Sequence, residues 1–97
     1  MYKPLPRCLT IKESGIHGFG LFAAEDISSG TVLGISHVVD NRFEDDHIRT
    51  PLGGFYNHSE EPNCGTYQLG DFVYLKAIKD IKTGEEIVCH YTLYMPL

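Results

Sequence analysis

The stretch GFYNHSEEPNCGTY, residues 54–67, is the most informative part of this chain. Asn57 and His58 follow directly on the aromatic residues Phe55 and Tyr56, which favours burial of both polar side chains. A buried amide or imidazole without a hydrogen-bond partner costs about 1–3 kcal/mol. Either these groups are satisfied within the protein, as in an Asx-turn, or they hold a polar ligand.

A metal-binding site is a further interpretation of residues 54–67 and the C-terminal motif, residues 83–91. It would recruit His58, Cys64, Cys89 and His90. Zinc prefers these residue types, but their spacing contains neither a C-x₂-C nor an H-x₃-H unit. The sequence therefore favours a polar turn, ranks a metal-dependent hydrolase last among the functions, and predicts no metal.

Length and composition predict a single domain spanning residues 1–97. The chain is 42% hydrophobic and 22% charged, which is typical of a globular protein. No apolar run approaches the roughly 20 residues that cross a bilayer, and the N-terminal residues do not form a signal peptide. The three cysteines are widely spaced and odd in number, which favours a reducing, intracellular location over a disulfide framework or secretion.

The charge distribution indicates which classes of binding partner suit this chain. The net charge is -5, and acidic residues gather at residues 44–46 and 60–61. No basic stripe is present, which argues against direct nucleic-acid binding. An acidic surface suits a basic protein partner, although a requirement for solubility explains it equally well.

Hydrophobic patterning predicts a mostly β protein built from small sheets. Short β-branched runs alternate with glycine-rich and polar turns, and no amphipathic helix of three turns is indicated. The predicted strands cover residues 7–12, 21–26, 31–39 and 85–94, with a hairpin over residues 66–78 that turns at Gly70-Asp71. The polar residues 40–51 are predicted to form a loop or one short helix.

One internal similarity is visible. Residues 26–30 (DISSG) and 80–84 (DIKTG) share an aspartate, an isoleucine and a final glycine. Two copies are too few for a repeat architecture. We expect two turns of the same kind, in which the glycine supplies a positive φ.

Two further motifs flank the central stretch. In GIHGFGLFA, residues 15–23, Gly18 and Gly20 leave the main chain open to another molecule, or simply form a bend. The motif lacks the third glycine of a dinucleotide fingerprint and the lysine of a P-loop. In TGEEIVCHY, residues 83–91, Tyr91 ends an apolar run, so its hydroxyl is expected either at the mouth of a cleft or in solvent.

Three motifs, in their order along the chain, resemble the signatures of the SET-domain family of protein-lysine methyltransferases. They are HGFGLFA (residues 17–23), NHSEEPNC (57–64) and GEEIVCHY (84–91). The likeness extends over about residues 8–94, and the compact length is similar to the minimal viral and bacterial members. The resemblance implies a SET-domain fold of several small sheets. In that fold the C-terminal strand threads beneath a loop in a knot-like arrangement.

The resemblance also implies a cofactor, S-adenosyl-L-methionine, and a substrate lysine in a basic protein segment. The residues expected to bind the cofactor are His17, Gly18, Phe19, Gly20, Asn57, His58 and Tyr94. Tyr91 matches the family's catalytic tyrosine, whose hydroxyl orients the reacting groups.

Three departures from the family pattern qualify these expectations. Glu60 stands where many members carry a zinc-binding cysteine, so no zinc is predicted. The insert over residues 34–53 is short and contains no tyrosine, and His90 replaces an acidic or small residue. Only six residues follow Tyr91. We therefore expect either a homodimer that completes the lysine channel or, as the alternative function, a catalytically weak SET-fold binding or assembly module.

Overall fold

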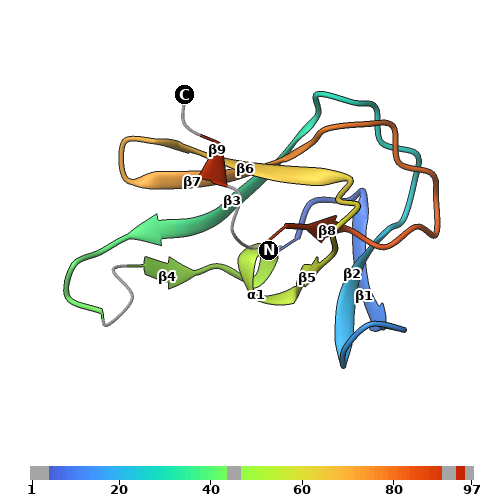
Figure 1. The fold of residues 1–97 in the computed structure, drawn as a ribbon, viewed down its shortest axis with the longest axis horizontal. Helices are drawn as coiled ribbons and strands as arrows, with labels where there is room; N and C mark the ends of the chain where they lie inside the picture. Colours follow the sequence, from blue (N-terminus) through green and yellow to red (C-terminus); the bar gives the residue numbers. More distant parts are fainter. Residues whose placement is uncertain (1–4, 44–46, 91–93, 96–97) are drawn as a thin grey trace.

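The computed structural model describes residues 5–43 and 47–90, together with the main chain of residues 94–95. It confirms the mostly β prediction. The described residues form nine short strands and one helical turn, whose arrangement is drawn in Figure 1. The elements in chain order are β1 (Leu9–Glu13), β2 (Phe19–Ala23), β3 (Val32–Val39), β4 (His47–Arg49), α1 (Pro51–Phe55), β5 (Asn57–His58), β6 (Cys64–Leu69), β7 (Phe72–Ala77), β8 (Val88–Cys89) and β9 (Tyr94–Met95).

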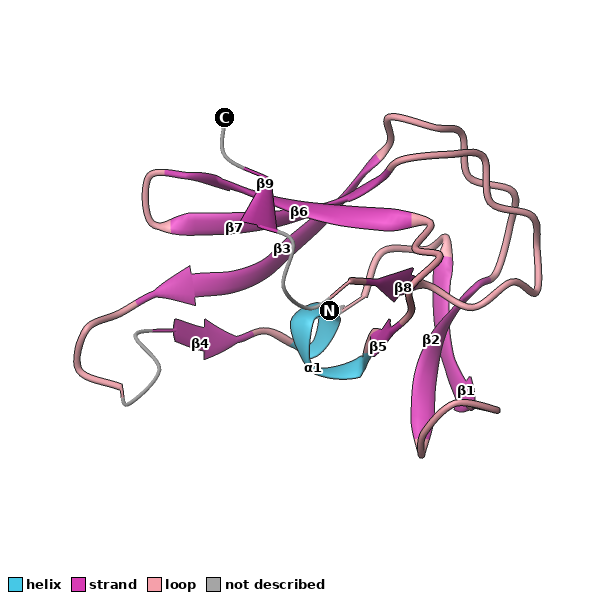
Figure 2. Ribbon diagram, viewed as in Figure 1, coloured by secondary structure: helices cyan, strands magenta, loops and turns pink. Residues whose placement is uncertain are grey.

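The strands form three small sheets. The largest has the order β4-β3-β7-β6-β9, β1 and β2 form an antiparallel hairpin, and β5 pairs with β8 in parallel. The β5–β8 pair lies between the large sheet and the hairpin (Figure 2). Within the described ranges, no helix has the length and apolar character needed to cross a membrane.

The predicted hairpin over residues 66–78 is confirmed. Strands β6 and β7 are antiparallel, and their register brings Leu69 opposite Phe72 across the Gly70-Asp71 turn. Gly70 has a φ of 59°, a left-handed conformation that suits glycine.

Two predictions along the chain were wrong. Residues 85–94 do not form one strand, because β8 ends at Cys89 and β9 is a separate strand that pairs with β6. Residues 47–49 form β4 rather than a loop or helix, since pairing with β3 outweighs their polar character and makes β4 the edge strand of the large sheet. The helical turn follows instead at α1, where the Thr50 hydroxyl caps the main-chain N–H of Gly53 at 3.3 Å.

The two similar turns face one another. Ile27 and Ile81 pair as an antiparallel bridge, and the loops that contain them run side by side (Figure 1). The main-chain N–H of Thr83 donates to Asp26 at 2.9 Å, and that of Ser29 donates to Asp80 at 2.8 Å. The first of these hydrogen bonds is the main reason that the pKa of Asp26 is lowered. Gly30 and Gly84 both have a φ of 90°, as predicted.

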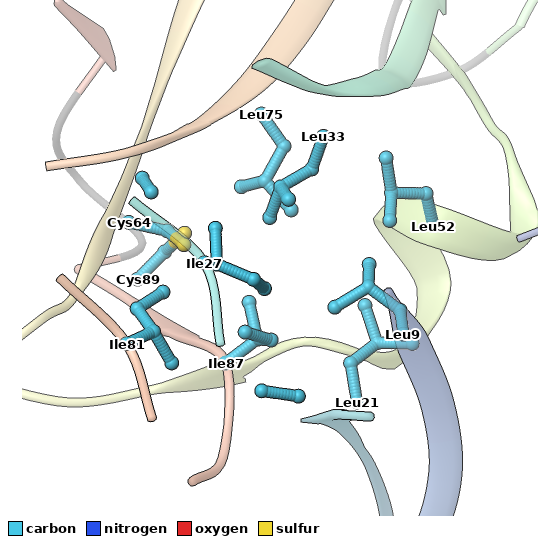
Figure 3. Packing of buried hydrophobic residues seen from close by; sticks show 12 residues of the cluster. Leu9, Leu21, Ile27, Leu33, Leu52, Cys64, Leu75, Ile81, Ile87 and Cys89 are labelled. Carbon is cyan, nitrogen blue, oxygen red and sulfur yellow. The ribbon is translucent and has the colours of Figure 1, made fainter. Parts of the chain in front are cut away.

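One hydrophobic core joins the three sheets and the paired turns (Figure 3). Its most buried side chains include Leu21 of the hairpin, Leu75 of the large sheet and Ile87, which directly precedes β8. Burying such side chains contributes about 1.5–3 kcal/mol each. The core thereby fixes the β1–β2 hairpin and the residues around β8 against each other, which positions the polar groups described next.

Candidate functional site

The side chain of Asn57, at the start of β5, connects three distant segments of the chain. It is 6% exposed. Its Nδ2 group donates to the Glu86 carboxylate at 2.7 Å, the Ser14 hydroxyl at 3.1 Å and the His17 carbonyl at 3.3 Å. The glycine-rich loop, the central motif and the C-terminal motif therefore meet at this amide.

Ser14 organises the loop between β1 and β2. Its hydroxyl lies 2.8 Å from both oxygens of the Glu86 carboxylate and donates to it. The same oxygen accepts from the main-chain N–H of Ile16 at 2.9 Å, and the Ser14 N–H donates to the Gly18 carbonyl at 2.7 Å. These contacts hold the loop closed on itself and against Glu86.

Gly20 packs directly on this polar cluster. A Cβ at this position would overlap the Glu86 carboxylate and lie 3.1 Å from Asn57 Nδ2. Gly18 has a φ of 49° and open space around it, so its glycine serves the turn and leaves the main chain accessible. Gly18 and Gly20 thus each have a role within the protein itself, besides any contact with a ligand.

The predicted site residues differ in their surroundings. His17, Gly18 and Phe19 are exposed, Gly20 and Asn57 are buried, and His58 is half-buried. The main chain of Tyr94 pairs with Thr66, while its side chain lies outside the described part. Tyr91, predicted to be catalytic, lies outside the described residues. The structure therefore brings the motifs that are predicted to bind the cofactor together around Asn57, and both the cofactor-binding and the catalytic assignments stay predictions.

The pairing of β5 with β8 places the central motif beside the C-terminal motif. Asn57 is in register with Val88, and His58 with Cys89. The Asn63 amide reinforces the contact, because it donates to the Glu86 carbonyl at 2.7 Å and accepts from the Val88 N–H at 2.9 Å. This arrangement is consistent with the expected threading, which stays a prediction because residues 91–93 are not described.

A second polar cluster lies next to the first. The Nε2 groups of His58 and His90 each donate to one oxygen of the Glu60 carboxylate, both at 3.1 Å. The two imidazole rings meet edge to face with their centroids 4.7 Å apart. The hydrogen bond from His58, followed by the charge and hydrogen bond of His90, lowers the pKa of Glu60.

The two cysteines of the metal reading do not join this cluster. Cys64 and Cys89 are buried, and their side chains point into the same part of the hydrophobic core (Figure 3). Burial raises the pKa of the Cys64 thiol to about 12 and raises that of Cys89 as well. Among the described residues, the histidine, cysteine and acidic side chains whose ligand atoms gather within 4.8 Å of one another are His58, Glu60 and His90, without either cysteine. The four-residue metal site is therefore wrong.

Sequence reasoning missed Ser14, Glu60 and Glu86 as parts of these clusters. Ser14 and Glu86 are 72 positions apart, so no local spacing rule relates them. Glu86 does carry a signal, since it is an acidic residue at the start of the apolar run IVC. Glu60 carries none, because an acid in a polar turn normally faces solvent.

The comparisons with known proteins agree with this architecture. The model of the SET domain matches residues 34–92, which is more than half of the chain. The chain belongs to the SET-domain family. The matched region contains Asn57, the His58 cluster and the β5–β8 pair, and it begins after the glycine-rich loop. Among curated proteins, none matches the chain.

Solved SET structures share the fold. A candidate histone methyltransferase from Plasmodium falciparum has a TM-score of 0.68 and 22% identity, over 90% of this chain and 95% of that one. The methyltransferase domain of human PR domain-containing protein 2 has a TM-score of 0.70 and 19% identity, over 89% of this chain and 78% of that one. A humanized mutant of the Chaetomium thermophilum Polycomb Repressive Complex 2 has a TM-score of 0.67 and 23% identity.

The coverage differs among these SET structures. The chain spans nearly all of the Plasmodium protein but only 15% of the Chaetomium chain, while 87% of this chain is covered there. At identities of 19–23% the likeness establishes the fold. Methyltransferase activity therefore has to be inferred from the family and from this chain's own residues.

The polar cluster around Asn57 leads to a first prediction. We expect Glu86→Ala to lower the free energy of unfolding by about 2 kcal/mol, because it leaves the buried Asn57 amide and the Ser14 hydroxyl with fewer partners. Glu86→Gln retains an acceptor oxygen for Asn57, so it should lose less than half as much. Urea denaturation followed by circular dichroism measures both. Equal losses in the two variants would contradict this expectation and would show that the negative charge of the carboxylate, which both variants lack, is what stabilises the cluster.

Proposed function

We propose that this chain is an S-adenosyl-L-methionine-dependent protein-lysine N-methyltransferase. Proteins of its family are methyltransferases that generally use this cofactor. The observation that carries the proposal is the position of the Asn57 amide. This one group contacts the His17 carbonyl of the glycine motif and the Glu86 carboxylate of the C-terminal motif. The three signatures that are separate in the sequence are therefore adjacent in the fold.

The residues of the glycine-rich loop suit such a cofactor. Its main chain is accessible, since His17 and Gly18 are exposed and nothing lies within 4 Å of the Cβ position at Gly18. The Phe19 side chain is 59% exposed, so its aromatic face is free to attract a positively charged sulfur. On this basis His17, Gly18, Phe19 and Gly20 would line one side of the cofactor, and the main chain of Asn57 and His58 the other.

Bound there, S-adenosyl-L-methionine supplies an electrophilic methyl group on its sulfonium. The protein's task is then mainly alignment, which alone accounts for a large part of many rate enhancements. The hydrogen bonds of Ser14 and Asn57 fix the loop relative to β5. The pairing of β5 with β8 fixes the segment that leads to Tyr91.

The lysine amine must lose a proton before it can react. The pKa of a free lysine is about 10.4, so the neutral amine is scarce at pH 7. A narrow apolar channel disfavours the ammonium form and lowers that pKa. We assign to the Tyr91 hydroxyl the hydrogen bond that orients the amine and the methyl group, and to Tyr94 a supporting place beside the cofactor.

The substrate that we propose is a lysine in a basic protein segment. The net charge of -5 favours such a partner, and Glu60 and Glu61 are exposed beside the central motif. The Plasmodium falciparum protein of similar fold is named as a histone methyltransferase, and histones are basic proteins of this class. Three further expectations stay predictions: a homodimer that completes the lysine channel, a location inside the cell, and a single domain over the whole chain.

Two measurements test the proposed function. Calorimetric titration of the folded protein with S-adenosyl-L-methionine should give saturable binding. Incubation with methyl-labelled cofactor and a lysine-rich basic protein should transfer label to lysine side chains. Binding without transfer would support the alternative, a SET-fold binding module. A folded protein that does not bind the cofactor would contradict both the cofactor assignment and the activity.

A further inference from the structure

We infer that His58, Glu60 and His90 form a binding site for one divalent transition-metal ion of the Zn²⁺ type. Their ligand atoms, two imidazole nitrogens and a carboxylate oxygen, all lie within 4.8 Å of one another. Two imidazoles and one carboxylate are a common ligand set for zinc. The site is separate from the cysteine-containing one considered from the sequence, and it revises the expectation that this chain binds no metal.

The distances suit a metal of this size. Tetrahedral zinc with ligands at about 2.0–2.1 Å keeps its ligand atoms about 3.3 Å apart. In the structure the Nε2 atom of His58 lies 3.1 Å from Oε1 of Glu60, and that of His90 lies 3.1 Å from Oε2. Only the remaining separations have to shorten, and all of them are at most 4.8 Å. Closing a separation of at most 4.8 Å to about 3.3 Å takes a relative movement of at most about 1.5 Å between the ligand atoms.

The main chain preorganises the two histidines. His58 ends β5 and pairs with Cys89 of β8, and His90 is the next residue along the chain. The Ser59 N–H donates to the Cys89 carbonyl at 2.9 Å, which extends the pairing through the segment that carries Glu60. The side chains of His58 and His90 are 33% and 24% exposed, so they are restrained but still reachable from solvent.

The accessibility of the cluster favours an exchangeable ion over a purely structural one. Three protein ligands leave one position of a tetrahedral ion open to water or another ligand. Stability alone gives little reason for the arrangement, since the Glu60 side chain is 80% exposed and surface ion pairs contribute about 0–1 kcal/mol. Both histidines direct Nε2 at the same carboxylate, which is the convergence that a bound cation requires.

The test uses ZnCl₂ and variants that spare the candidate cofactor site. Calorimetric titration of the whole chain should show one site that depends on the cluster. Glu60→Gln and His90→Gln should each weaken the Kd by at least about tenfold, because loss of a ligand costs no less than loss of a supporting group. Glu61→Gln is the matched control, since it removes the same charge from the neighbouring exposed residue. It should bind as the unchanged protein does.

A second readout does not depend on activity. Zinc should raise the Tm of the unchanged protein and of Glu61→Gln, but not that of Glu60→Gln, since a ligand stabilises only the state that binds it. Equal zinc affinity in Glu60→Gln and Glu61→Gln would overturn the site, and so would the absence of zinc binding. Both zinc readouts are made without S-adenosyl-L-methionine and without a protein substrate, so failure of the metal site is distinguishable from failure of the proposed methyl transfer.

Discussion

Gly53→Ala is expected to lower the free energy of unfolding by about 3 kcal/mol or more, although the same change normally stabilises a helix. In an ordinary helix interior, alanine is better than glycine by about 0.5–1 kcal/mol. Gly53 is buried in α1, where the helical turn packs against β3. A Cβ at this position would overlap the carbonyl oxygen of Ser36 and lie 2.8 Å from its carbonyl carbon.

The Ser36 carbonyl cannot move aside easily. It accepts the main-chain N–H of Thr50 at 3.0 Å, and the Thr50 hydroxyl lies 3.1 Å from it. Relief of the clash therefore separates α1 from β3 or breaks the cap of the helix. Overpacking of this kind costs about 1–3 kcal/mol where side chains can adjust, and the main chain adjusts less. With a total stability of about 5–15 kcal/mol, the loss is a large fraction.

Gly54→Ala is the matched control for this prediction. Gly54 lies in the same helical turn, is exposed, and has nothing within 4 Å of its Cβ position. Alanine there should leave the stability unchanged or raise it by up to about 1 kcal/mol. Urea denaturation of both variants gives the comparison. Similar midpoints for the two proteins would mean that α1 does not pack on β3 as described.

The sequence predicted those parts of the fold that local patterns determine. The β6–β7 hairpin follows from the Gly70-Asp71 turn between two β-branched runs, and the paired turns follow from their shared glycines. Strand β4 was missed because its sequence, HIR, has little strand character, and only the exposed edge of β3 makes it one. The division of the last strand into β8 and β9 likewise depends on which partner each segment meets.

The candidate site was predictable in its motifs but not in its contacts. The resemblance to the SET-domain family implied that Asn57 lies beside the glycine-rich loop, and the structure brings them together. The groups that hold Asn57 in place were not predictable, because the pairing of Ser14 with Glu86 depends on the whole fold. The same holds for Glu60 and His90, which are 30 positions apart and meet only because β5 and β8 are paired.

Tyr91→Phe should reduce the rate of methyl transfer by about 100-fold or more while leaving cofactor affinity nearly unchanged. The variant removes one hydroxyl and keeps the aromatic ring. Loss of a single hydrogen-bond donor aimed at the reacting groups lowers kcat by about 10²–10³-fold in enzymes where it has been measured. Tyr91 directly follows His90 in the sequence, and the described segment that precedes it, β8, pairs with β5 of the central motif.

The rate effect and the binding effect separate a catalytic tyrosine from a structural one. Transfer is measured under single-turnover conditions, and cofactor binding by calorimetry on the same preparation. Tyr74→Phe is a suitable control, because Tyr74 lies in β7, which pairs with β3 and β6 and carries none of the three motifs. It should leave transfer unchanged. If Tyr91→Phe transfers methyl groups as fast as this control, the hydroxyl does not orient the reaction. If both transfer and cofactor affinity fall together, Tyr91 maintains the site and does not act on the substrate.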